Sequence, residues 1–154
     1  MAGKAHVVVL TNAALVLPLA YEWQNESHGQ ALGVTVDARY GLADLARRMT
    51  DPSCVVLGLV TDDEVHGFMS LQEFASPLGP ERMMNEHFFY VGAKHRGIGS
   101  MRLLKAAREV TKQRGCSHLL LNASHVAAEK PDRVCKLYEK IGAKPFETTM
   151  IVEV

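Results

Sequence analysis

The stretch Val91–Ser100 reads VGAKHRGIGS and joins an aromatic run to a basic one. The run before it, Glu86–Val91, is rich in residues that favour β-strands. The run after it, Met101–Arg114, carries apolar residues at helical spacing. Gly97 and Gly99 therefore stand where the chain turns from strand into helix. Without side chains, they let a ligand approach the backbone closely.

This turn predicts an anion-binding site at the start of the helix. Free N–H groups and the positive end of the helix dipole favour a phosphate there, and Lys94, His95 and Arg96 add charge beside it. A glycine pair between strand and helix also suits a plain tight turn. The charge distribution favours the anion site, because the whole chain is balanced at 17 Lys+Arg and 17 Asp+Glu while this segment is strongly basic.

Length and composition indicate one ordinary globular domain. The chain has 154 residues, of which 47% are hydrophobic and 22% charged. Its formal net charge of zero argues against a general nucleic-acid or membrane-surface binder. The apolar run from Val7 to Ala20 loosely resembles a leader segment, but Thr11 and Asn12 interrupt it, so a strand followed by a helix explains it better.

The cysteines and histidines give no metal or disulfide pattern. Cys54, Cys116 and Cys135 are odd in number and form no CxxC pair, so we expect free thiols and a cytoplasmic location. The seven histidines show no HxxxH or HxH spacing, which argues against a metal hydrolase and predicts no metal site.

Periodicity and turn signals predict the remaining elements of a mixed α/β sheet protein. Pro18 should kink or split the first helix, and the crossover from Glu86 to Asn122 should place two strands in parallel. The predicted strands are His6–Leu10, Cys54–Val60, Val65–Phe74, Glu86–Val91, His118–Asn122 and Thr148–Val154; the helices run from Thr11-Asn12 to about Glu26, over Asp37–Met49, Met101–Arg114 and Pro131–Ile141; and Ala75–Asn85 is a long loop.

A second motif closes the last predicted helix. Val134, Leu137, Tyr138 and Ile141 recur at the spacing of a buried helix face, and the run from Lys136 to Ala143 reads KLYEKIGA. Together with Lys94-x-x-Gly97-x-Gly99, this resembles the GCN5-related N-acetyltransferase (GNAT) family. Its members often carry an Arg/Gln-x-x-Gly-x-Gly/Ala loop and, about forty residues later, a Leu-Tyr-Glu-Lys-x-Gly-Phe helix end.

Two departures from the family pattern are visible. Lys94 stands where the family prefers Arg or Gln, and an alternative alignment places Arg96 there and shortens the loop by one residue. Ala143 replaces the usual aromatic residue after Gly142. Neither change removes the backbone N–H groups on which phosphate binding depends.

The resemblance implies a single α/β domain with a mixed, mostly antiparallel central sheet flanked by helices. Its fourth and fifth strands, here Glu86–Val91 and His118–Asn122, would splay apart and hold acetyl-CoA between them. Backbone groups of the fourth strand would bond the pantetheine arm, and the glycine turn would hold the pyrophosphate. The implied cofactor-binding residues are Phe89, Tyr90, Val91, Lys94, His95, Arg96, Gly97, Ile98, Gly99, Ser100 and Asn122.

The resemblance also implies N-acetyltransferase chemistry, in which a neutral amine attacks the thioester of acetyl-CoA. A base must take the proton of the amine, and Glu86 is the first candidate, followed by Glu73 and His125. Tyr138 is the candidate acid for the departing thiolate. A solvated strand-end charge at Glu86 and a core aromatic residue at Tyr138 are the structural alternatives.

The sequence leaves the amine acceptor, the catalytic activity and the oligomeric state open. The amine acceptor could be a small molecule or a protein, and loops Ala75–Asn85 and Ala123–Lys130 should border its site. A non-catalytic coenzyme- or protein-binding module is the alternative function. The run Thr149–Val152 is a candidate edge strand that could pair with another subunit in a homodimer.

Overall fold

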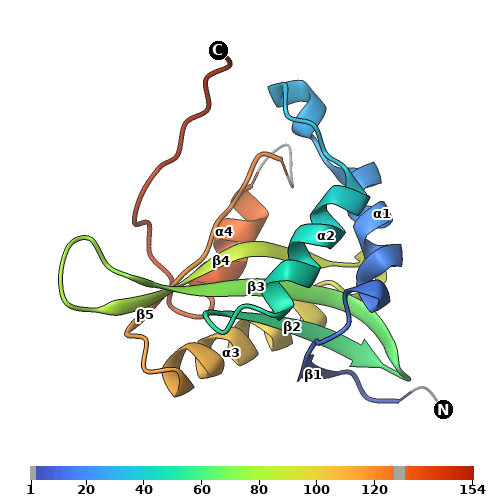
Figure 1. Cartoon of the computed structure of the whole chain (residues 1–154), viewed down its shortest axis with the longest axis horizontal. Coiled ribbons are helices and arrows are strands. Elements are labelled where there is room, and N and C mark those ends of the chain that lie inside the picture. The colour runs from blue at the N-terminus through green and yellow to red at the C-terminus, as the bar shows by residue number, and fades with distance from the viewer. Residues whose placement is uncertain (1–2, 127–130) are drawn as a thin grey trace.

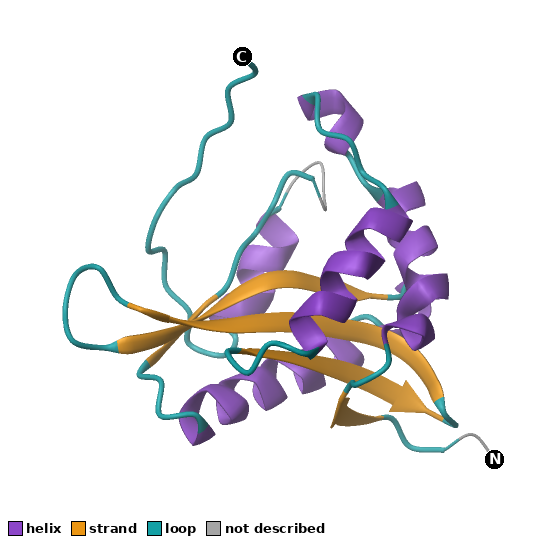
Figure 2. Cartoon of the chain, viewed as in Figure 1, coloured by secondary structure: helices purple, strands orange, loops and turns teal. Residues whose placement is uncertain are grey.

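A five-stranded sheet organises the described part of the chain, residues 3–126 and 131–154 of a computed structural model (Figures 1 and 2). The strands lie side by side in chain order; the first four are antiparallel, and the fifth runs parallel to the fourth. They are β1 (His6–Val9), β2 (Cys54–Thr61), β3 (Glu64–Ala75), β4 (Arg82–Val91) and β5 (His118–Leu120).

Helices cover both faces of this sheet (Figure 1). Asn12 and Asp37 begin two of the helical segments by accepting hydrogen bonds from the first-turn amides. Pro18 lies in the first turn of α1, so the predicted first helix is split there as expected. The helical segments are η1 (Ala13–Val16), α1 (Leu17–Glu26), η2 (Gly29–Leu32), α2 (Ala38–Met49), η3 (Ala93–His95), α3 (Ile98–Gln113) and α4 (Asp132–Glu139).

The core has one apolar cluster on each side of the sheet. The predicted stripe of α3 is confirmed, because Leu103, Leu104 and Ala107 are fully buried against β2 and β3. Burying each such leucine stabilises the fold by about 2 kcal/mol. The cluster on the other side joins η1, α1 and α2 to the sheet through Val16, Leu19 and Leu45, among others.

The fourth and fifth strands part after a short parallel pairing, as the family resemblance implied. Only Met83–Asn85 of β4 pairs with β5, so from Glu86 onward β4 has no β5 partner. The β3–β4 register also shifts there: Leu71 pairs with Glu86 and Ser70 with Phe88. His87 is therefore the extra residue of a β-bulge, which bends the strand and increases its local twist.

Two sequence predictions about the strands are wrong. The loop expected at Ala75–Asn85 is shorter, because β4 begins at Arg82 and the wholly buried Met84 pairs with Glu73 across the β3–β4 hairpin. The strand expected at Thr148–Val154 is a loop that ends away from the sheet (Figure 1). Its apolar side chains lack the burial that would order them: Met150 is 85% exposed.

Candidate active site

Glu86 is the carboxyl group at the point where β4 leaves β5. It lies within β4 rather than at the start of a strand, and it is 3% exposed. Burial raises the pKa of Glu86 to about 7, although hydrogen bonds from Asn122 act in the opposite direction. His87, the next residue, is exposed and contacts Gln72, so its side chain lies on the opposite face of the strand from the buried Glu86 carboxyl.

Asn122 connects the two parted strands. Its backbone N–H donates to Glu86 Oε2 at 3.0 Å, and its side-chain amide donates to the Glu86 carbonyl and, at 3.3 Å, to Asn85 Oδ1. These bonds fix the orientation of the buried carboxyl group. Asn85, which had been assigned to a loop, was therefore missed as a member of this network.

Tyr138 reaches the same network from α4. Its hydroxyl donates to the Asn122 carbonyl at 2.9 Å, and its ring stacks at 6.3 Å on Phe89 of β4. Burial and the nearby Glu86 carboxyl raise the pKa of Tyr138 above its ordinary value, so the hydroxyl stays protonated. The structure thus brings both predicted catalytic residues together around Asn122.

The glycine turn, which contains Gly97 and Gly99, forms the start of α3. Gly97 has a φ of 82°, a conformation that favours glycine, and Gly99 packs so closely on β2 that a Cβ would meet Leu59 Cδ2 at 2.6 Å. The first helical hydrogen bond joins the Met101 amide to the Gly97 carbonyl. The amides of residues 98–100 precede it and have no acceptor within the helix. Such amides and the helix dipole favour an anion, so anion binding at this turn stays a prediction.

The basic residues before this turn differ in what they contact. Lys94 is exposed on η3, whereas the Arg96 guanidinium bonds to Glu26 of α1 and to the Val91 carbonyl at 2.9 Å. His95 donates its amide to the Gly92 carbonyl at 2.8 Å, and burial lowers the pKa of its ring, which is stacked on another histidine.

These contacts define which strand and loop groups stay accessible to a ligand. The Val91 carbonyl and the His95 amide are already bonded inside the protein, while Phe89 and Tyr90 lie in β4 beyond its pairing with β5. Glu26 was missed as the partner of both Arg96 and the Tyr90 hydroxyl. No local signal could have found it, because it lies 70 residues from Arg96.

The other candidate bases are Glu73 and His125. Glu73 is bonded to Arg114 at 2.7 Å and to Arg82 at 3.0 Å, and these guanidiniums lower its pKa, so it stays ionised as a structural anion. His125 follows β5 in the chain and precedes 127–130, the part of the predicted Ala123–Lys130 loop outside the described residues. Among the residues described, no group of three or more His, Cys, Asp or Glu could hold a metal ion.

Comparison with known proteins agrees with this geometry. The sequence profile of the acetyltransferase (GNAT) family matches residues 17–143, most of the chain. The chain belongs to the GNAT family. No curated protein matches this GNAT domain in sequence. Among the helices that the structure describes, none is long and apolar enough to cross a membrane.

Solved structures share the fold of this GNAT domain at low sequence identity. A ribosomal-protein-alanine N-acetyltransferase from Brucella melitensis biovar Abortus 2308 is 21% identical, with a TM-score of 0.74 over 98% of this chain and 99% of that one. An aminoglycoside acetyltransferase from an uncultured soil metagenomic sample is 18% identical, with a TM-score of 0.72 over 98% and 99%. A Bacillus halodurans C-125 structure named as a transcriptional regulator is 15% identical, with a TM-score of 0.75 over 98% and 100%.

Proposed function

We propose that this GNAT domain transfers an acetyl group from acetyl-CoA to a primary amine. The observation that carries the proposal is the buried Glu86 carboxyl, with a pKa of about 7, at the parting of β4 and β5. A carboxyl group with that pKa is suited to general base catalysis near neutral pH. Family membership gives the acetyltransferase class, and the donor and acceptor are our assignments.

The residues present fit the coenzyme. The first-turn amides of α3 have no acceptor within the helix, and beyond Asn85 one edge of β4 has no β5 partner. We assign the amides of residues 97–100 to the pyrophosphate, and the backbone of Phe89 and Tyr90 to the pantetheine arm. Lys94 is the exposed cation that would approach the phosphates. When bound, acetyl-CoA would supply the acetyl group as an activated thioester.

We assign the proton of the attacking amine to Glu86. A primary amine is mostly protonated at neutral pH and cannot attack until a base removes a proton. The Asn122 amide holds one carboxyl oxygen, Oε2, at 3.0 Å and so orients the base. The Tyr138 hydroxyl, kept protonated by burial, is the group that we assign to protonate the departing thiolate.

The acceptor has an accessible groove beside this network. It has a volume of about 570 Å³ and reaches Asn85, His87 and Leu120, next to the parting strands. Its other walls are mainly apolar and include Phe74 and Met83. The groove lies on the His87 face of β4, opposite the Glu86 carboxyl, so we assign to it the body of the acceptor. The amino group, of either a small amine or a protein, would reach Glu86 through the parting of β4 and β5.

Two further properties follow from the same surface and composition. All three cysteines are free thiols, which supports a reducing, cytoplasmic location. The C-terminal segment exposes Met150, Ile151 and Val152, and it is the surface at which we would expect a homodimer to form.

A non-catalytic coenzyme-binding module is the second candidate. It is favoured by the Tyr138 hydroxyl, which already donates to the Asn122 carbonyl and must leave that bond to protonate a thiolate. Coenzyme binding without turnover would distinguish this module from the enzyme.

The test is free-thiol release from acetyl-CoA across a panel of amines, with coenzyme binding measured in parallel by calorimetry. The panel should contain peptides with free amino termini, lysine peptides, polyamines and aminoglycosides. We expect thiol release with at least one class, and a loss of about 100-fold in Glu86→Gln with coenzyme affinity retained. Binding with no release for any amine would support the module, and no binding at millimolar coenzyme would refute both.

A further inference from the structure

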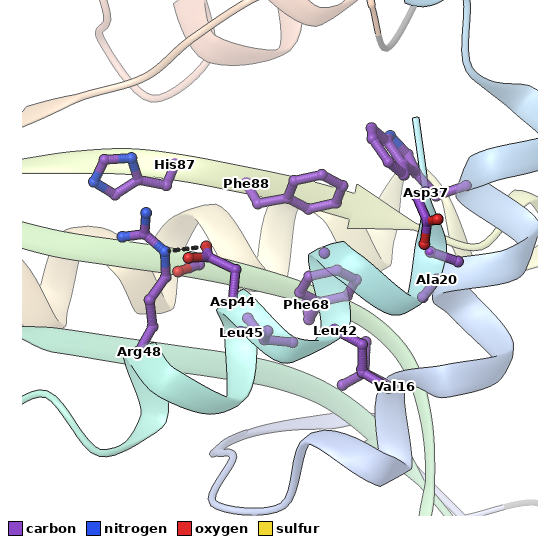
Figure 3. Close-up of a pocket in the computed structure, with 14 residues that line it drawn as sticks. Val16, Ala20, Asp37, Leu42, Asp44, Leu45, Arg48, Phe68, His87 and Phe88 are labelled. Atoms are coloured by element: carbon purple, nitrogen blue, oxygen red, sulfur yellow. Dashed lines mark hydrogen bonds and ion pairs between the residues drawn. The ribbon is translucent and has the colours of Figure 1, made fainter. Parts of the chain in front are cut away.

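A second cavity lies between α1, α2 and the sheet (Figure 3). Tyr138 belongs to the apolar cluster on the other face, with α3. Its volume is about 170 Å³. An engineered apolar cavity of about 150 Å³ in another protein binds benzene, so the space suits one aromatic ring.

The walls of this cavity are aromatic. Phe88 stacks on Phe68 with ring centroids 5.1 Å apart, and Trp23 meets Phe88 edge-on at 4.6 Å. In Figure 3, Phe68 and Phe88 lie between the sheet and α2, with Leu42 and Leu45 nearby. Such rings pack well against a further ring, edge-on or offset.

One polar group is buried in this apolar lining without a partner. Ser70 lines the cavity from β3 and is 1% exposed, and its hydroxyl has no hydrogen-bond partner among the described residues. A buried, unpaired hydroxyl is costly and rare in folded proteins. A ligand that carries a hydrogen-bonding group would satisfy it.

Gly41 is an exposed residue of α2 that borders the cavity. Gly41 lines the cavity from within α2, and a Cβ added there would meet no atom within 4 Å. Glycine is less favourable than alanine in a helix interior, and nothing in the packing excludes a larger residue.

The charged groups at the rim favour a neutral ligand. Asp44 is paired with Arg48 at 2.7 Å, Asp37 caps α2, and burial lowers the pKa of His87, so its ring stays neutral at pH 7. We propose that this cavity binds a single neutral aromatic ring carrying one hydroxyl or amino group, which pairs with Ser70 Oγ. The cavity shares His87 with the acceptor groove, but binding of this ligand does not depend on acetyl transfer.

The test compares phenol with toluene, which has the same shape but a methyl group in place of the hydroxyl. Trp23 is the only tryptophan in the chain and lines the cavity, so its fluorescence reports binding directly. Phenol should bind to the wild-type protein. Ser70→Ala should lower the phenol-to-toluene affinity ratio about tenfold, because phenol loses its hydrogen-bond partner while toluene does not.

Gly41→Leu is the second variant, since a large side chain at this exposed edge of the cavity should hinder binding of both probes. Thermal unfolding of each variant checks that it is folded. Three results would each overturn the proposal: no phenol binding to the wild type, an affinity ratio unchanged by Ser70→Ala, or undiminished phenol binding to folded Gly41→Leu. Acetyl transfer is not part of the readout, so the outcome is distinguishable from failure of the proposed function.

Discussion

Replacing Glu86 by glutamine should stabilise the protein at neutral and alkaline pH while it abolishes most of the activity. The pKa of Glu86 is about 7 in the folded protein, against an ordinary value of 4.5. Between these values the folded protein holds a proton that the unfolded chain has released. The free energy of unfolding contributed by Glu86 therefore falls by about 1.4 kcal/mol per pH unit as the pH rises through this range.

Above about pH 7, the free energy of unfolding has fallen by the full amount, about 3 kcal/mol. Glutamine does not ionise, so the stability of the variant does not fall in this pH range. Its side-chain carbonyl oxygen can still accept the hydrogen bond from the Asn122 amide. Urea unfolding of both proteins at several pH values measures the difference. The stability of Glu86→Gln relative to wild type should rise by about 3 kcal/mol between about pH 4.5 and pH 8.

The difference in the free energy of unfolding between the two proteins, taken at each pH, cancels the contributions of other titrating groups, because both proteins contain them. A difference that does not change with pH would show that Glu86 titrates like a solvated carboxyl group. That result would refute the buried-base role, whatever the activity of the variant.

Three further substitutions test the acid, the glycine turn and the structural ion pairs of Glu73. Tyr138→Phe should lower turnover at least tenfold and destabilise the fold by about 1 kcal/mol, through loss of the bond to Asn122; steady-state kinetics with unchanged turnover would remove Tyr138 from the acid role. Gly97→Ala should cost about 1–2 kcal/mol at φ 82° and weaken coenzyme binding in calorimetry; undiminished affinity would exclude this turn from the site. Glu73→Gln should destabilise by about 1 kcal/mol at pH 7, and the effect should vanish as acid protonates Glu73, whose pKa is lowered by Arg114; the same loss at low pH in urea unfolding would contradict that pairing.

Local sequence patterns predicted the parts of the fold that local physics determines. Leu103, Leu104 and Ala107 lie on one face of α3 because apolar residues at helical spacing must be buried together. Gly97 was predicted at a strand-to-helix turn, and its positive φ explains the glycine. Tyr138 was placed correctly on the buried face of α4.

Other features depend on contacts between distant segments, which periodicity does not encode. The guanidinium of Arg96 bonds to Glu26 because α1 packs against β4, just before Arg96 in the chain, so its charge is shared with α1. The run 148–154 has strand-forming residues, but a strand also needs a neighbour to pair with, and none is present in the described structure. The parting of β4 from β5 was available only through the family resemblance, since it depends on where their pairing ends.

The most direct measurement of the central claim is the change in backbone amide resonances when coenzyme A is added. If β4 and the start of α3 hold the coenzyme, the largest shifts should occur at residues 86–91 and 97–100, with little change at β1. Saturable binding that leaves both of these segments unperturbed would contradict the assignment of the site.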